Sequence, residues 1–203
     1  MITLIFGPMF SGKTTYLLSY ERRFLIAKKS VLLVKWSKDT RYSEHRIVTH
    51  NGEHNQSKSI VSVGALSSIP YELLHNTECI LIDEGQFFPD LMEWCQAYEH
   101  RRVAGAEVIK RHIVIAGLSG DYKQQSFEPI TAIIPIADHI IHLKSICSVC
   151  AADAPFTVRT SHETAQTVIG NDDKYQPRCK DCLESVVTSS PVANELLQTN
   201  SAV

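Results

Sequence analysis

Short apolar runs rich in β-branched residues recur along the chain, and segments with helical spacing lie between them. The apolar runs are ITLIF (2–6), VLLVK (31–35), CILID (79–83), HIVIAGL (112–118) and HIIHL (139–143). Helical spacing is clearest over residues 12–28 and 89–103. Buried strands that alternate with helices indicate a parallel sheet covered by helices on both faces. We therefore expect residues 1–143 to form one α/β domain.

The pattern changes after residue 143, where two C-x-x-C pairs flank short polar runs. The turn-rich stretch GNDDKYQP (170–177) lies between the pairs, and this part of the chain has too few apolar residues to enclose a core unaided. We expect residues 144–187 to form a small metal-stapled domain. Residues 188–203 show little periodicity or bulk and are predicted to be a mobile tail.

Composition and charge argue against nucleic acid and membrane as the main partners of the chain. The 203 residues are 44% hydrophobic, which is enough for a core, and 20 basic against 22 acidic residues give a formal charge of −2. This balance provides no basic surface for a long polyanion, so nucleic acid is not the expected main partner. The chain starts on a strand-like segment without a signal peptide, and no apolar run reaches the ~18–20 residues of a membrane span. We expect a soluble cytoplasmic protein.

The first apolar run leads directly into a phosphate-loop motif. GPMFSGKT fits the pattern G-x-x-x-x-G-K-[ST] and lies between a predicted strand and a predicted helix, as the mechanism requires. Backbone N–H groups of the loop and the helix N-terminus would hold the β- and γ-phosphates of a nucleotide. Lys13 would neutralise developing charge, and the Thr14 hydroxyl would bind Mg²⁺. The predicted phosphate-binding residues are Gly7, Pro8, Met9, Phe10, Ser11, Gly12, Lys13 and Thr14.

An acidic pair follows the run CILI and is the candidate for the chemistry. Asp83 would lie at the carboxyl edge of the sheet beside the phosphate loop and hold Mg²⁺. Glu84, which strand alternation would point the other way, could take a proton from the group that attacks the γ-phosphorus. Water as the attacker would give an ATPase, and a substrate hydroxyl would give a kinase.

The two cysteine pairs predict a structural metal site. CSVC (147–150) and CKDC (179–182) fit a zinc ribbon that holds a looped-out segment, with Cys147, Cys150, Cys179 and Cys182 as ligands. Four thiolates leave Zn²⁺ no open position, so the metal would stabilise the fold only. Reduced free thiols are the alternative. Because zinc ribbons often bind nucleic acid, an ATP-driven nucleic-acid-binding protein is an alternative function, although the positive and negative charges of residues 144–187 cancel. A GTPase is a further alternative, but it would need NKxD and DxxG motifs that the chain lacks.

The motifs together resemble one known family. GPMFSGKTT (7–15), KDTRY (38–42), DEGQFFPD (83–90), the pair from Cys147 and DKY (173–175) occur in the order seen in thymidine kinases of the cytosolic and poxvirus type, over residues 1 to about 183. The resemblance implies a kinase that uses Mg-ATP to phosphorylate the 5′-hydroxyl of thymidine, and of deoxyuridine, in nucleotide salvage. It also implies a homotetramer that thymidine triphosphate inhibits through the same pocket.

The resemblance assigns roles to individual residues. It implies that Glu84 is the general base, and that Asp39 and Arg41 lie near the transferred phosphate. Without the resemblance, a surface ion pair would be the preferred interpretation of Asp39 and Arg41. For the nucleoside it implies a base pocket that Thr157 and the segment 168–175 close, with backbone groups of that segment reading the thymine edge. The implied pocket residues are Met9, Phe87, Leu118, Tyr122, Phe127, Thr157, Val168 and Tyr175. Met9, Phe87 and Tyr122 could equally be ordinary core residues.

Three departures from the family pattern affect the expected affinity but not the reaction. The chain reads LSGDY (118–122) where LDGTF is common, so Ser119 stands in place of an acid and Tyr122 in place of a phenylalanine against the base. The segment 99–111 is longer than the usual link from helix to strand. Gln166 stands where a valine is usual.

Overall fold

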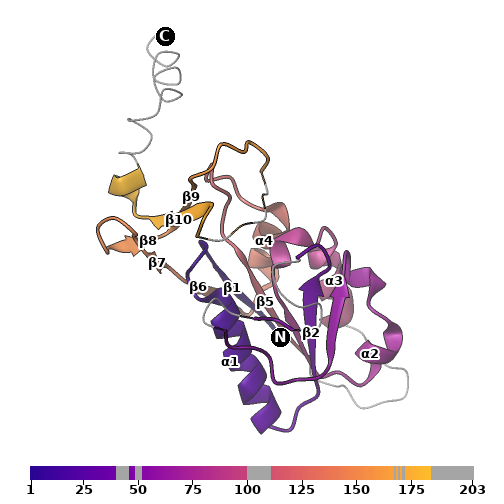
Figure 1. The fold of residues 1–203 in the computed structure, drawn as a ribbon. Coiled ribbons are helices and arrows are strands. Elements are labelled where there is room, and N and C mark those ends of the chain that lie inside the picture. The colour runs from indigo at the N-terminus through magenta and orange to yellow at the C-terminus, as the bar shows by residue number, and fades with distance from the viewer. Residues whose placement is uncertain are drawn as a thin grey trace.

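The computed structural model describes residues 1–39, 46–48, 52–99, 111–166, 168, 170 and 172–183. Within them lies a six-stranded parallel sheet of order β3-β2-β4-β5-β1-β6 (Figure 1). Its strands are β1 (Ile2–Gly7), β2 (Val31–Trp36), β3 (Ile60–Val63), β4 (Cys79–Ile82), β5 (His112–Leu118) and β6 (His139–His142). Every apolar run expected to be a strand is one. The additional edge strand β3 is short and half-buried, so its apolar pattern is weak.

Helices cover both faces of this sheet, which confirms the predicted fold class. They are α1 (Lys13–Ile26), α2 (Tyr71–His75), α3 (Leu91–Glu99) and α4 (Glu128–Ile133). Alternate residues of β2 point to opposite sides: Leu33 packs with Leu17 and Leu18 of α1, whereas Val34 packs in the cluster that contains α3 and α4. Residues 100–103, expected to extend the helix that begins near residue 89, lie outside the described residues.

A buried carboxylate attaches the segment before β3 to α1. Glu21 is fully buried, and its carboxylate accepts hydrogen bonds from the backbone N–H groups of Gln56 (3.0 Å) and Ser57 (2.6 Å). Asn55 continues this connection, because its Oδ1 accepts the N–H of Ile47 at 2.9 Å. Residues 46–48 are thereby fixed relative to α1.

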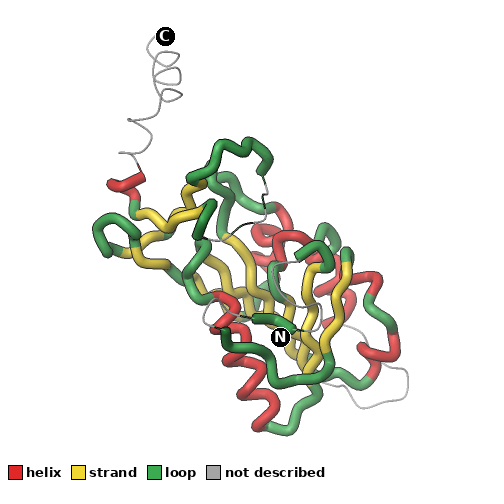
Figure 2. The backbone as a smooth tube through the Cα atoms, in the orientation of Figure 1, coloured by secondary structure: helices red, strands yellow, loops and turns green. Residues whose placement is uncertain are grey.

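The cysteine pairs belong to a smaller unit beyond the carboxyl ends of the strands. Figure 2 shows its strands at the upper left, apart from the main sheet. The unit contains two antiparallel pairs, β7 (Ser145–Ile146) with β8 (Asp153–Ala154), and β9 (Phe156–Arg159) with β10 (Tyr175–Arg178). We call residues 144–183 the cysteine unit. The expected tail, residues 188–203, lies outside the described residues. No helix of the described chain is both long and apolar enough to cross a bilayer.

Candidate active site

The phosphate loop connects β1 to α1 in a conformation that requires glycine twice. Gly12 has φ +80°, a left-handed value that other residues seldom adopt, and α1 begins at the next residue. A Cβ on Gly7 would lie 2.3 Å from the carbonyl oxygen of Leu143, so only glycine fits there. Inside the loop, the Lys13 ammonium donates to the Pro8 carbonyl at 2.6 Å and the Ser11 hydroxyl donates to the same oxygen at 2.8 Å. The Lys13 charge therefore lies within the loop.

Asp83 lies beside the first turn of α1, as expected. It follows β4, and its backbone N–H donates to the Val34 carbonyl, so the residue stays in line with the neighbouring strand. The Thr14 hydroxyl is 3.4 Å from one carboxylate oxygen of Asp83 and 3.5 Å from the other. A hydroxyl beside a carboxylate is an oxygen donor set of the kind that Mg²⁺ binds next to phosphates. These two residues therefore fit the expected magnesium site.

Glu84 is oriented by a turn and not by strand alternation. The strand ends at Ile82, and Glu84 adopts φ 54° and ψ 44° at the start of a 3₁₀ turn (Gly85–Phe87). The expectation that alternation sets its direction is therefore wrong, because Glu84 lies beyond the strand. Its Oε2 accepts a hydrogen bond of 2.6 Å from Nε2 of Gln86. Gln86 is buried, and its Oε1 accepts the N–H of Leu118 at 3.0 Å, so this amide joins Glu84 to the end of β5.

A cavity of about 410 Å³ brings the predicted residues together. Lys13, Thr14, Asp39, Asp83 and Glu84 line one part of it. All eight residues expected to contact the nucleoside line it as well: Met9, Phe87, Leu118, Tyr122, Phe127, Thr157, Val168 and Tyr175. Phe10 and Gly12 of the phosphate loop contribute, whereas Gly7, Pro8 and Ser11 are not among the lining residues. Arg41 lies outside the described residues.

The cysteine unit forms part of the cavity wall and contacts the phosphate loop directly. The Thr157 hydroxyl accepts the N–H of Met9 at 2.9 Å, and the Ser145 hydroxyl donates to the carbonyl of Phe10 at 3.2 Å. Thr157, expected to close over the base, thus also holds the backbone of the loop that would bind phosphate.

Several lining residues were missed by the sequence analysis. Lys35 is buried at the carboxyl end of β2, and a lysine at the end of the run VLLVK was a usable signal. Trp36 stacks on Phe87 with ring centroids 4.2 Å apart, a contact that no sequence spacing reveals. Arg46 and Asp121 also line the cavity.

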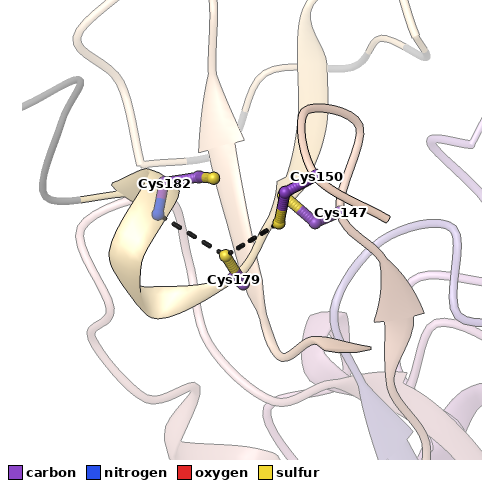
Figure 3. A group of neighbouring side chains, drawn as sticks. All are labelled: Cys147, Cys150, Cys179 and Cys182. Atoms are coloured by element: carbon purple, nitrogen blue, oxygen red, sulfur yellow. Dashed lines mark hydrogen bonds between the residues drawn. The ribbon is translucent and has the colours of Figure 1, made fainter. Parts of the chain in front are cut away.

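The four cysteines of the two pairs converge at one end of the cysteine unit (Figure 3). All four sulfur atoms lie within 4.8 Å of one another, and Sγ of Cys150 is 3.5 Å from Sγ of Cys179. A tetrahedral zinc with Zn–S bonds of about 2.3 Å separates its sulfurs by about 3.8 Å, so the group fits zinc.

The ionisation of these thiols points the same way. Hydrogen bonds from backbone groups, that of Cys179 first, lower the pKa of Cys147 to about 6, whereas hydrogen bonds with Cys179 and Cys150 raise the pKa of Cys182 to about 12. A divalent cation bound among the four sulfurs would favour the ionised form of each.

Comparisons with known proteins agree with the geometry. The sequence model of the family described as "Thymidine kinase" matches residues 1–183. The chain is 36% identical over 181 residues to the cytosolic thymidine kinase of Gallus gallus, which covers 89% of this chain and 75% of that protein. It is 36% identical to the thymidine kinase of Myxoma virus (strain Lausanne), over 89% of this chain and 94% of the viral one. It is 37% identical to the cytosolic thymidine kinase of Homo sapiens, over 94% and 76% of the two chains. With this match along nearly all of its described length, the chain belongs to the thymidine kinase family.

Proposed function

We propose that this enzyme transfers the γ-phosphate of ATP to the 5′-hydroxyl of thymidine, and of deoxyuridine, in the cytoplasm. One observation carries the proposal: Glu84, the Thr14–Asp83 pair and the phosphate-loop lysine open onto the same cavity as the apolar and aromatic side chains that suit a nucleoside base. An enzyme that only hydrolysed ATP would have no use for that second, apolar half of the cavity.

The residues divide the reaction between them. The phosphate-loop backbone and Lys13 hold the β- and γ-phosphates, while Thr14 and Asp83 would hold Mg²⁺. When bound, that ion supplies positive charge to the phosphate oxygens. Glu84 accepts the proton of the 5′-hydroxyl as that oxygen bonds to the γ-phosphorus and the bond to the ADP oxygen breaks. Asp39 and Arg41 lie near the transferred phosphate in this proposal, where Arg41 offsets negative charge that accumulates in the transition state.

The base lies against the apolar half of the cavity. Phe87, Leu118 and Phe127 would contact its faces and edges, and backbone groups of residues 168–175 would pair with its polar edge. Cytosine presents the opposite pattern of donors and acceptors and would leave buried groups unpaired, which is a strong basis for its rejection. Once the nucleoside fills the cavity, water is excluded and the bound hydroxyl attacks ATP instead.

Three further parts complete the proposal, and the last two of them rest on the family resemblance. The cysteine unit binds one structural Zn²⁺, which its four clustered sulfurs support. The enzyme is a homotetramer, and thymidine triphosphate inhibits it by occupying the nucleoside cavity. Light scattering of the purified protein tests the tetramer, and competition of thymidine triphosphate against thymidine tests the inhibition.

The decisive experiment measures phosphate transfer from Mg-ATP with thymidine, deoxyuridine, deoxycytidine or no nucleoside, following ADP and nucleoside monophosphate together. ADP formed in step with thymidine monophosphate, with little product from deoxycytidine, is the expected result. ADP released without a phosphorylated nucleoside would make water the attacker and overturn the proposal.

A further inference from the structure

Arg159 is the centre of a hydrogen-bond network that no role proposed above uses. Arg159 is the last residue of β9 and is only 9% exposed to solvent. Its guanidinium donates to three backbone carbonyls of one turn, those of Glu163 (2.8 Å), Ala165 and Gln166 (3.1 Å). We call residues 160–166, which form this turn after β9, the lasso loop. Arginine alone has a planar fork of N–H donors that can serve several carbonyls at once without accepting a bond itself.

The same guanidinium connects the lasso loop to both tyrosines of the nucleoside cavity. Its Nη2 donates to the hydroxyl of Tyr175 at 2.8 Å, and that hydroxyl donates to the carbonyl of Val168 at 2.9 Å. Its carbon atom lies 3.8 Å from the ring centroid of Tyr122 and 5.2 Å from that of Tyr175. A cation this close to an aromatic face, and largely removed from water, is attracted to it.

Tyr122 provides a second connection across the same boundary. It follows β5 of the main sheet, whereas the lasso loop belongs to the cysteine unit. The Tyr122 hydroxyl donates to the carbonyl of Thr164 at 3.0 Å. The lasso loop is therefore held on Tyr122 twice, through its ring by way of Arg159 and through its hydroxyl directly. Tyr122, Tyr175, Gln166 and Val168 all line the nucleoside cavity.

We propose that Arg159 is a positioning residue that holds the lasso loop closed over the nucleoside cavity, with the Tyr122 hydroxyl as a second latch, so that together they set the affinity for the nucleoside. This inference rests on the proposed function, because it assigns the cavity wall to nucleoside binding. Without the guanidinium, the carbonyls of the lasso loop lose their shared donor and Tyr175 loses the bond that orients its hydroxyl. ATP binding depends on the phosphate loop, which Arg159 does not contact through any of these bonds.

Three variants test the proposal against a matched control. Arg159→Met removes the fork but keeps much of the apolar stem, Arg159→Lys keeps the charge without the fork, and Tyr122→Phe removes one hydroxyl. The control is Lys144→Met, which breaks an exposed ion pair with Asp153 (2.9 Å) in the same cysteine unit; neither residue is among those that line the cavity. For each protein we would measure kcat, KM for thymidine, KM for ATP, the melting temperature, and hydrogen exchange of a peptide covering residues 160–166.

The expected pattern separates affinity from turnover. Arg159→Met should raise KM for thymidine at least about tenfold, the scale of one or two charge-assisted hydrogen bonds, while KM for ATP and kcat change about twofold or less. Arg159→Lys should fall between Arg159→Met and the unmodified enzyme, and Tyr122→Phe should raise KM about threefold through loss of one neutral bond. Exchange of the lasso-loop amides should accelerate in all three variants and stay unchanged in Lys144→Met.

Two results would overturn the inference. One is an Arg159→Met protein with normal KM for thymidine and normal exchange in the lasso loop. The other is a parallel fall in kcat, affinity for both substrates and melting temperature, which would show that Arg159 supports the whole fold. Failure of the unmodified enzyme to phosphorylate thymidine would instead refute the proposed function, and hydrogen exchange would still decide whether Arg159 holds the loop.

Discussion

Gln86 offers the sharpest test of how the proposed general base is held. In the variant Gln86→Met, Glu84 loses the amide donor 2.6 Å from its Oε2, and the N–H of Leu118 loses its acceptor at 3.0 Å. A hydrogen bond to a charged group contributes about 1.5–3 kcal/mol, and an unpaired buried N–H costs about 1–3 kcal/mol. The first loss removes the hydrogen bond that orients the base toward the 5′-hydroxyl, and the second destabilises the end of β5.

These magnitudes predict that kcat of Gln86→Met falls about ten- to a hundredfold, since each 1.4 kcal/mol of lost transition-state stabilisation is about a factor of ten. The free energy of unfolding should fall by about 1–3 kcal/mol. Steady-state kinetics with thymidine measures the first effect, and urea denaturation measures the second. Calorimetric titration with thymidine shows whether the remaining cavity still binds it.

Gln86→Glu separates orientation from packing. It keeps an acceptor for the Leu118 N–H but places a second carboxylate beside Glu84, where two like charges at hydrogen-bond distance hold a proton between them. Because the base must be ionised to act, the acid limb of the kcat/KM profile should move to higher pH. A Gln86→Met enzyme with kcat within about twofold of the original, together with an unmoved pH profile for Gln86→Glu, would refute the idea that Gln86 orients the base.

Three other predictions follow from the site and the fold. Glu84→Gln should lower kcat/KM by about 10²–10⁴ and leave the thymidine dissociation constant nearly unchanged in calorimetry, and loss of binding by a folded variant would contradict its role as base. Metal analysis should find one zinc per chain. A strong chelator should release it and accelerate hydrogen exchange in the cysteine unit before it does so in the main sheet. Unchanged hydrogen-exchange protection of the cysteine unit after metal removal would argue against a structural zinc. Glu21→Gln should lower the free energy of unfolding by about 1.5–3 kcal/mol in urea, because a buried charged acceptor of two N–H bonds is lost. The control Glu53→Gln, on the exposed ion pair with Arg22, should change it by less than about 1 kcal/mol, and equal effects would refute the distinction.

The sequence predicts those parts of the site that are contiguous in the chain. The phosphate loop, the Asp83–Glu84 pair and the cysteine pairs are recognisable because the chemistry requires particular residues at short, fixed spacings. The parallel sheet is equally accessible, since strands buried on both faces are apolar without interruption. Strand alternation reaches only as far as the strand, and it therefore fails at Glu84, which lies beyond β4 and has left-handed backbone dihedral angles.

Contacts between distant segments are what the sequence conceals. Gln86 meets Leu118, and Arg159 meets Tyr122, only because β4 and β5 are neighbours and the cysteine unit folds back over the end of the sheet. No sequence spacing identifies such partners. In the sequence, Gln86 is only one residue of the motif DEGQFFPD, and Arg159 is only one of the charged residues of the segment 144–187, whose charges cancel. Their roles depend on burial and on donors that converge in space.

The position of Trp36, stacked on Phe87 in the cavity wall, makes intrinsic tryptophan fluorescence a probe of ligand binding. The chain has two tryptophans, of which Trp36 lines the cavity, whereas Trp94 of α3 stacks on Tyr98 and packs, partly buried, against the core. Indole emission responds to the polarity and quenching groups around the ring, so a ligand that enters the cavity displaces water from the surroundings of one fluorophore only. Replacing Trp94 with phenylalanine would leave a single emitter at the site. Nucleoside association and release could then be followed in a stopped-flow instrument without a labelled substrate.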